Sequence, residues 1–179
     1  MKVTKTSLSE CFIIEPTIIG DERGYFYESF HQKKFEDLTG LKVNFVQDNQ
    51  SLSRKGTLRG LHFQRDDYAQ AKLVQVLRGT VLDVVVDLRE GSKTFGKHFS
   101  IELSSENKKQ LFIPRGFAHG FVVLSAEAEF FYKCDNYYHK DAESGIMYND
   151  PDLGIDWELP QRELIISDKD LHLPSFSAL

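Results

Sequence analysis

Residues 72–89 read KLVQVLRGTVLDVVVDLR, two runs of β-branched and other apolar residues on either side of Arg78-Gly79-Thr80. β-Branched side chains pack well in strands, and a glycine between two such runs is a turn signal. The pattern therefore predicts two strands joined as a β-hairpin at Gly79. A fold that contains this segment is expected to be built mainly from sheet.

The rest of the chain carries the same kind of signal. Residues 98–114, HFSIELSSENKKQLFIP, predict a second pair of strands with a turn near Ser105-Glu106-Asn107, and FVVLS (121–125) and AEFFYKC (128–134) predict two more. Many short strands with frequent turns are typical of sandwiches and barrels. We therefore predict an all-β fold, a jelly-roll barrel with a few short peripheral helices, whose open mouth is the place for a ligand.

One segment carries a helix signal. Residues 31–39, HQKKFEDLT, are followed by Gly40, which is a suitable C-terminal cap. Phe35 and Leu38 are three positions apart, as residues on one helix face are.

Length and composition set limits on organisation and function. The chain has 179 residues without repeats or a linker, so residues 1–179 are expected to form a single domain. A net charge of −5 argues against nucleic-acid binding, and no apolar stretch is long enough to span a membrane. Cys11 and Cys134 are far apart in the sequence, which predicts free thiols and, with no export signal evident, a cytoplasmic protein.

A metal site is the first chemistry to test. Cupin barrels often bind a metal through a His-x-His block followed by Glu and a later Pro-x-Gly-x-x-His block. The second block is present as Pro114, Gly116 and His119, but the first offers only His62, because position 64 is Gln64. A catalytic divalent site normally needs three protein ligands, and glutamine is a poor substitute for imidazole. We therefore expect no bound metal.

Several polar residues stand among apolar strand residues and are candidates for a pocket. They are Arg23 and Glu28 around Phe26, Gln47 and Asn49 on one strand face, Arg59 and His62, Lys72, and Tyr132, Tyr137 and Tyr138. Each has an ordinary alternative, because a strand Arg or Lys is commonly a solvated surface residue and a Tyr commonly belongs to the core. Spacing alone leaves both interpretations open.

The motifs together resemble one family. GDERGYFYESF (20–30), FVQDN (45–49), LRGLHFQ (58–64), AQAKLVQVLRGTVLDVVVDLR (69–89), IPRGFAHGF (113–121), EFFYKCDNYY (129–138) and SDKD (167–170) occur in order. They are similar to those of the dTDP-4-dehydrorhamnose 3,5-epimerases, from about residue 3 to the C-terminal tail. The resemblance implies a cupin-type jelly-roll homodimer that works without a metal or an organic cofactor. It also implies inversion of C3 and C5 in dTDP-4-keto-6-deoxyglucose, giving dTDP-4-keto-rhamnose.

The resemblance also implies catalytic roles. His62 matches the base, and Asp170, in SDKD, matches its carboxylate partner. Lys72 matches a cation beside O4, where the negative charge of an enolate develops, and Tyr132 matches an acid on the opposite face of the sugar.

Binding residues follow from the same matches. Arg23 and Arg59 match diphosphate contacts, Gln47, Asp48 and Asn49 lie near the nucleotide, Tyr138 matches a ring that stacks on thymine, and Phe26, Glu28, His119, Glu143 and Lys169 match further substrate contacts. Two positions depart from the family pattern: Gln50 stands where His is frequent, and Tyr148 where Trp is common. Both departures bear on pocket shape.

Four other functions remain as alternatives. A sister epimerase would invert C3 only or C5 only with the same base and acid. A 3,4-ketoisomerase of the same nucleotide sugar fits the motifs less well. A metal-dependent cupin oxygenase or isomerase would contain a metal, and a non-catalytic sugar-binding barrel would bind without exchanging protons.

Overall fold

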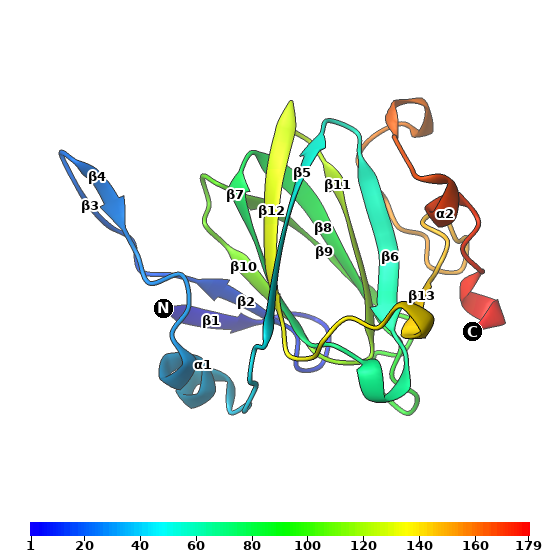
Figure 1. The fold of residues 1–179 in the computed structure, drawn as a ribbon, viewed down its shortest axis with the longest axis horizontal. Coiled ribbons are helices and arrows are strands. Elements are labelled where there is room, and N and C mark those ends of the chain that lie inside the picture. The colour runs from blue at the N-terminus through cyan, green and yellow to red at the C-terminus, as the bar shows by residue number, and fades with distance from the viewer.

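The fold is a barrel of two facing antiparallel sheets, described for all of residues 1–179 by a computed structural model (Figure 1). One sheet has six strands in the order β1-β2-β10-β7-β12-β5 and the other has five in the order β13-β6-β11-β8-β9. The six-stranded sheet consists of β1 (Lys2–Lys5), β2 (Phe12–Glu15), β10 (Gln110–Ile113), β7 (Lys72–Arg78), β12 (Glu127–Cys134) and β5 (Gln47–Arg54). The five-stranded sheet consists of β13 (Glu143–Gly145), β6 (Leu58–Gln64), β11 (Phe117–Val123), β8 (Thr80–Asp87) and β9 (His98–Ser104). The predicted all-β jelly-roll class is confirmed.

The predicted hairpin at Gly79 is wrong. β7 pairs with β10 and β12, whereas β8 pairs with β11 and β9, so the two strands lie in different sheets. A hairpin needs at least two connecting residues, and here Gly79 alone separates the strands. Its φ of 79° bends the chain from one sheet into the other, and a Cβ there would lie 2.1 Å from the Glu127 carbonyl oxygen.

The predicted pair in residues 98–114 needs the same correction. The turn occurs at residues 105–107, but β9 pairs with β8, whereas β10 pairs with β2 and β7. The turn therefore also crosses between sheets. Runs of β-branched and other apolar residues identified the strands, but they did not identify the strands' partners.

Helix α1 (Gln32–Thr39) confirms the helix prediction. His31 caps its N-terminus by accepting a hydrogen bond from the Lys34 backbone N–H, and Gly40 ends it with a φ of 74°. Phe35 is fully buried, but Leu38 is 51% exposed, so only one of the two predicted apolar positions faces the core.

Apolar clusters fill three layers. The first lies between the two sheets, the second covers the outer face of the five-stranded sheet with the C-terminal segment, and the third packs α1 on the six-stranded sheet. β8 is buried along almost its whole length because Val81 and Val85 face the first cluster while Leu82, Val84 and Val86 face the second.

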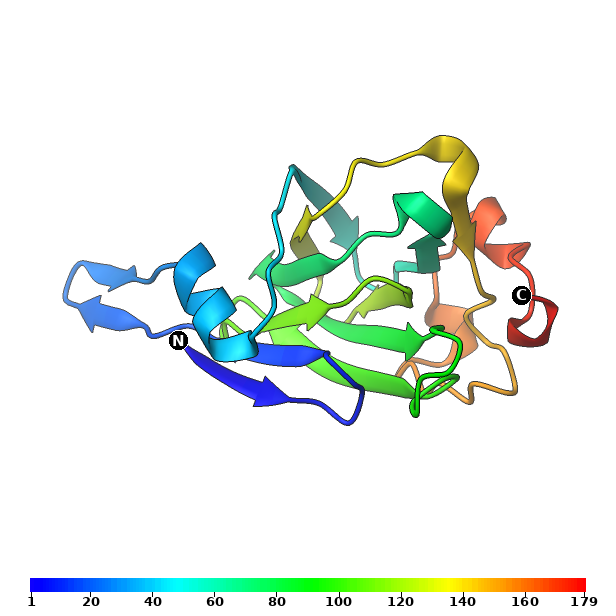
Figure 2. The ribbon, with the colours of Figure 1, turned by 90° about the horizontal axis from the view of Figure 1, so that it is seen from below.

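The C-terminal segment places the short helix α2 (Asp168–Leu171) beside β6 (Figures 1 and 2). The C-terminal segment also contains two 3₁₀ turns, at Gln161–Glu163 and Phe176–Ala178. Two further 3₁₀ turns, at Asp66–Tyr68 and Lys140–Ala142, lie in the loops before β7 and β13. No helix in the protein is long and apolar enough to cross a membrane.

One hairpin lies apart from the barrel. β3 (Ile19–Asp21) and β4 (Gly24–Phe26) pair only with each other and project beyond the barrel in both views (Figures 1 and 2). All six of their residues are exposed. The hairpin carries large apolar side chains into solvent: Ile19 is 65% exposed and Phe26 is 66% exposed.

Candidate active site

A pocket of about 320 Å³ opens between the two sheets. It is lined by Asn49, Gln50, Ser51, Arg59, His62, Lys72, His119, Phe121, Phe130 and Tyr132. Six of these residues were candidates from the sequence, and they come from both sheets. The structure therefore brings a large part of the predicted site together.

His62 and Asp170 form a pair at the wall made by β6. The His62 Nε2 and Asp170 Oδ1 atoms are 2.7 Å apart, and the Gly60 backbone N–H donates to the other carboxylate oxygen at 3.2 Å. Burial opposes ionisation of Asp170, but the hydrogen bond and charge of His62 and the Gly60 amide outweigh it and hold the pKa of Asp170 below its usual value. The pair is thus an imidazole backed by an ionised carboxylate, while the His62 side chain remains 30% exposed toward the pocket.

The C-terminal segment brings Asp170 to this place. Ile165 exchanges backbone hydrogen bonds with the start of β6, donating to Gly56 at 2.8 Å and accepting from Leu58 at 3.0 Å. Ser167 then caps α2, its hydroxyl accepting from the Asp170 N–H at 3.2 Å. The backbone hydrogen bonds of Ile165 and the Ser167 cap therefore fix the Asp170 carboxylate beside His62, although the two residues are distant in sequence.

Lys72 and Tyr132 enter the pocket from the opposite sheet, on β7 and β12. The Lys72 Nζ atom lies 5.8 Å from the centre of the Tyr132 ring. Burial lowers the pKa of Lys72 and raises the pKa of Tyr132, because a low-dielectric environment disfavours the charged form of each group. At neutral pH Tyr132 therefore retains its proton.

His119 lies beside His62, since the two residues pair directly across β11 and β6. Its Nε2 atom is 2.8 Å from Asp83 Oδ2, and both side chains are buried. No three His, Cys, Asp or Glu side chains of the 179 residues gather in a way that could hold a metal ion. The expectation that no metal is bound stays a prediction for elemental analysis.

Arg59 faces the same side as His62 although the two are three residues apart. The pairing of β6 with β11 is irregular between His119 and Phe121, opposite Gly60, and such a bulge breaks the alternation of side chains. Gly60 is needed there because a Cβ would lie 2.5 Å from the Gly120 Cα. Arg59 lines the pocket, and its Nε atom donates to the Ser53 hydroxyl at 3.1 Å.

The three predicted substrate contacts on β5 lie on both faces of the strand. Gln47 and Asn49 lie on one face and are joined by a hydrogen bond of 3.0 Å, and the Asn49 amide lies 3.7 Å from the Cys134 sulfur. Asp48 is exposed on the other face and pairs with Lys133 at 2.9 Å. A substrate contact from Asp48 would therefore involve its backbone.

Tyr138, Glu143 and Lys169 form a chain of contacts near β6. The Tyr138 hydroxyl donates to Glu143 Oε2 at 2.9 Å, and Lys169 pairs with the same carboxylate at 2.5 Å. Burial would raise the pKa of Glu143, but these two partners outweigh it and lower that pKa. The ring of Tyr138 is half exposed, as a stacking platform has to be.

Arg23, Phe26 and Glu28 do not join this group. Arg23 and Phe26 are on the projecting hairpin, where Arg23 contacts Asp21 of the same hairpin. Glu28 pairs with Lys34 of α1. The hollow that Arg23 and Phe26 line has no residue in common with the pocket between the sheets.

Sequence reasoning missed four lining residues and two partners. Ser51, Phe121 and Phe130 are two positions from Asn49, His119 and Tyr132, so strand alternation offered a signal for them. Gln50 was noted only as a departure from the family pattern. Asp83, which binds His119, and Gln64, which binds a loop, had no sequence signal for these roles.

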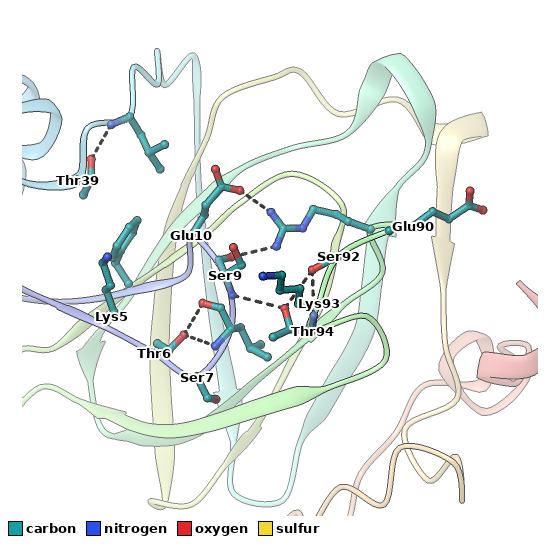
Figure 3. A pocket seen from close by; sticks show the side chains of 15 residues that line it. Lys5, Thr6, Ser7, Ser9, Glu10, Thr39, Glu90, Ser92, Lys93 and Thr94 are labelled. Atoms are coloured by element: carbon teal, nitrogen blue, oxygen red, sulfur yellow. Dashed lines mark hydrogen bonds and ion pairs between the residues drawn. The ribbon is translucent and has the colours of Figure 1, made fainter.

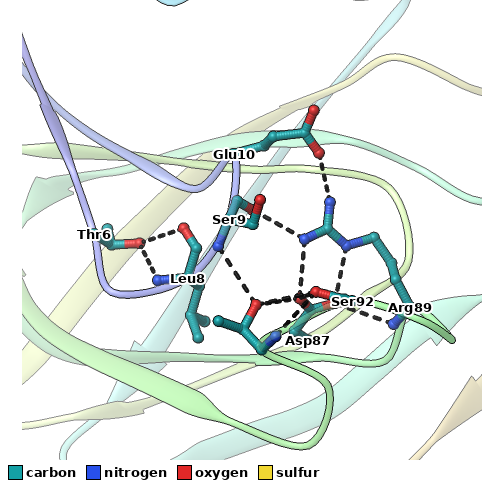
Figure 4. Close-up of polar contacts among 8 residues, drawn as sticks. Thr6, Leu8, Ser9, Glu10, Asp87, Arg89 and Ser92 are labelled. Atoms are coloured by element: carbon teal, nitrogen blue, oxygen red, sulfur yellow. Dashed lines mark hydrogen bonds and ion pairs between the residues drawn. The ribbon is translucent and has the colours of Figure 1, made fainter.

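A larger hollow of about 940 Å³ lies elsewhere, between the β1–β2 turn and the loop after β8 (Figure 3). Arg89 there binds both Asp87 and Glu10, and Ser92 and Thr94 also donate to Asp87 (Figure 4). The central charged groups of this hollow satisfy one another.

Comparisons with known proteins agree on one family. The family model for dTDP-4-dehydrorhamnose 3,5-epimerase matches residues 5–178. A dTDP-4-dehydrorhamnose 3,5-epimerase of Shigella flexneri is 54% identical over 176 residues, covering 98% of this chain and 96% of the relative.

Two solved structures are similar throughout. The dTDP-4-dehydrorhamnose 3,5-epimerase of Elizabethkingia anophelis shares 59% identity with a TM-score of 0.97, covering 99% of this chain and 97% of that one. A 3,5-epimerase of Legionella pneumophila, solved in complex with dTDP-4-keto-L-rhamnose, shares 52% identity with a TM-score of 0.95, covering 99% and 94%.

Proposed function

This chain belongs to the dTDP-4-dehydrorhamnose 3,5-epimerase family, and from that premise we propose how its residues carry out the reaction. It is an isomerase that converts dTDP-4-dehydro-6-deoxyglucose to dTDP-4-dehydrorhamnose in dTDP-rhamnose biosynthesis. The observation that carries the mechanism is that His62 and Tyr132 line one pocket from opposite sheets, with Asp170 bound to His62 behind the pocket wall.

His62 is the base in this mechanism. The C4 ketone acidifies the C–H bonds at C3 and C5, and the imidazole takes a proton from each carbon in turn. Asp170 holds the ring in place and stabilises the imidazolium that forms, because its lowered pKa keeps it ionised at neutral pH.

Lys72 and Tyr132 complete the cycle from the other sheet. Deprotonation places negative charge on O4, and the Lys72 ammonium stabilises that charge where it develops. Tyr132, which retains its proton because burial raises its pKa, delivers a proton to the face of the sugar opposite His62. The Tyr132 phenolate is then reprotonated from solvent, and His62 releases its proton there.

The remaining contacts hold the nucleotide. Arg59 binds diphosphate, His119 the sugar, and Tyr138 stacks on thymine near Glu143 and Lys169. Gln47, Asn49 and the backbone of Asp48 lie along the nucleotide. The placement of Arg59, Asn49 and His119 in the pocket wall supports these roles.

Arg23, Phe26 and Glu28 serve the pocket of a second copy of the chain. The hairpin that carries Arg23 and Phe26, and that Glu28 follows in the chain, projects away from its own barrel, and a two-stranded ribbon with exposed apolar side chains is barely stable by itself in water. Docking on a partner would bury Phe26 and bring the Arg23 guanidinium toward a bound diphosphate. The assembly is therefore a homodimer with hairpins exchanged between the two sites.

A reducing compartment suits the chain. Cys11 and Cys134 are buried free thiols, and burial raises the pKa of Cys134 to about 11, which keeps it unreactive beside the pocket. We place the enzyme in the cytoplasm, where its nucleotide-sugar substrate would be made.

Hydrogen exchange tests the proposed chemistry. Incubating the 4-keto-6-deoxyglucose nucleotide with enzyme in deuterated water should place deuterium at both C3 and C5, as NMR would show. Label at one carbon only would assign a C3-only or C5-only epimerase. Label at neither carbon would overturn the base role of His62, and an activity that requires stoichiometric metal would favour a metal-dependent cupin.

A further inference from the structure

Gln64 has a role that neither the proposed chemistry nor the substrate contacts explain. It ends β6 two residues after His62, so both side chains leave the same face of the strand. Its side chain is only 7% exposed, and its Oε1 atom accepts a hydrogen bond of 2.8 Å from the backbone N–H of His139. A metal-binding cupin would have a histidine ligand at this position, whereas this amide binds a loop.

The loop held by Gln64 carries Tyr138. It leaves β12 and crosses to β13, drawn in yellow in Figure 1. The backbone N–H of Tyr138 donates to Gln47 Oε1 of β5 at 3.0 Å, so consecutive amides of the loop bind glutamines from the two different sheets. These two bonds fix the backbone at the base of the Tyr138 ring.

Other contacts restrain the same segment at its two ends. The Gln70 amide donates to the Asn136 carbonyl oxygen at 2.8 Å, and the Tyr138 hydroxyl donates to Glu143 at 2.9 Å. Glu143 pairs with Gln64 across β13 and β6. The ring is therefore restrained at its hydroxyl by Glu143, the strand partner of Gln64, and at its backbone by Gln47, next to the His139 amide that Gln64 binds.

We propose that Gln64 is a positioning residue that orients the Tyr138 ring for the nucleobase and takes no part at the reacting carbons. This inference rests on the proposed stacking of Tyr138 on thymine. Loss of one hydrogen bond to the loop would let the ring move and weaken nucleotide binding. The transfer of protons by His62 and Tyr132 would continue in the bound state.

The test compares Gln64→Met, which keeps the side-chain length but lacks the acceptor, with the wild type. We expect dTDP binding by calorimetry to weaken about tenfold and KM to rise by a similar factor, the size expected for one hydrogen bond. The kcat should stay within about twofold, since the reacting groups are untouched. Gln161→Met, which loses a hydrogen bond to Tyr148 outside the pocket, is the matched control and should leave dTDP binding unchanged.

A double-mutant cycle separates positioning from a general structural effect. In a Tyr138→Ala background, Gln64→Met should cause no further loss of dTDP affinity, because the ring it orients is gone. Gln64→Glu, which keeps an acceptor at the same reach, should bind dTDP within about threefold of wild type. If Gln64→Met does not fold, Gln64→Glu alone decides the test. A tenfold or greater loss of dTDP affinity in Gln64→Glu would then overturn the inference.

Three other results would also overturn it. They are a fall in kcat with KM unchanged, an equal Gln64→Met loss with and without Tyr138, and unchanged dTDP binding in Gln64→Met. If Tyr138→Ala itself binds dTDP normally, the stacking role in the proposed function fails as well. If Tyr138→Ala weakens binding and Gln64→Met does not, only the role of Gln64 fails.

Discussion

Lys72 and Tyr132 share one pocket, and burial moves their pKa values in opposite directions. The lysine loses its positive charge as pH rises through a pKa below its usual 10.5, whereas the tyrosine keeps its proton past its usual 10. Because both groups must be protonated for the reaction, we predict that loss of the Lys72 proton sets the alkaline fall in kcat/KM.

Lys72→Arg tests this assignment. A guanidinium stays charged over the accessible pH range, so the alkaline limb of the kcat/KM profile should move to higher pH, even if the variant is slower at every pH. Tyr132→Phe is the control, and any activity it retains should keep the wild-type limb. An unchanged limb in Lys72→Arg would assign the titration to another group.

Single residues also mark how far the sequence could lead. His62, Lys72 and Tyr132 were found because the motifs around them resemble a family, not because spacing placed them together. Regular alternation would put Arg59 and His62 on opposite faces of β6, and only the bulge opposite Gly60 brings both into the pocket. Asp170 reaches His62 through contacts 108 residues apart in the chain, which no local pattern encodes.

At the scale of elements, the loop after β8 is held by a network centred on Asp87. This side chain is fully buried, and it accepts hydrogen bonds from Arg89, Ser92 and Thr94 (Figure 4). Burial alone would raise the pKa of Asp87, but these donors outweigh it and hold that pKa far below its usual value. The network fixes the β1–β2 turn as well, because Arg89 also binds Glu10 at 2.6 Å.

Asp87→Asn should destabilise the protein. Removing one partner of a buried charged pair costs about 3 kcal/mol in the free energy of unfolding. Because the folded pKa lies below the unfolded value, the carboxylate stabilises the fold fully above about pH 5 and progressively less as pH falls below about 4. Urea unfolding at several pH values should therefore show a shallower loss on acidification in Asp87→Asn than in wild type.

Glu10→Gln is the matched control for this network. Its side chain is 52% exposed, so removing its charge should cost less than about 1 kcal/mol. Equal losses in the two variants would show that burial of Asp87 is not what gives the network its strength.

Elements differ in how well the sequence predicted them. The helix over residues 31–39 was predicted almost to the residue because its cap and its end are local signals. The strands between residues 72 and 134 were found for the same reason, but the partners of β7, β8, β9 and β10 were not. Strand pairing depends on contacts between distant segments, and Gly79 turns the chain between sheets where a hairpin was expected.

On the scale of the whole molecule, the two sheets share one apolar core and residues 1–179 are proposed to form a single domain. Only the β3–β4 hairpin lies outside this body (Figure 2). Two of the predicted substrate contacts, Arg23 and Phe26, are on this hairpin, and we propose that they reach the substrate bound to a neighbouring copy. The proposed homodimer is therefore part of the proposed mechanism.

Mixing two inactive variants tests the exchange of hairpins. His62→Ala lacks the base but keeps the hairpin, and a double Arg23→Ala, Phe26→Ala variant lacks the hairpin contacts but keeps the base. After subunit exchange the mixture should recover roughly a quarter of wild-type activity, since half of the dimers are mixed and each holds one intact site. No recovery, with mixed dimers demonstrated by mass spectrometry, would show that each hairpin does not serve its partner's site.

In the proposed mechanism, His62 removes protons and Tyr132 returns them from the opposite face of the sugar. The most direct measurement is the NMR time course of label and configuration at C3 and C5 in deuterated water, for wild type, His62→Ala and Tyr132→Phe. We predict exchange with inversion in wild type, no exchange at either carbon in His62→Ala, and exchange without completed inversion in Tyr132→Phe. Exchange at wild-type rates in His62→Ala, or full inversion in Tyr132→Phe, would contradict this mechanism.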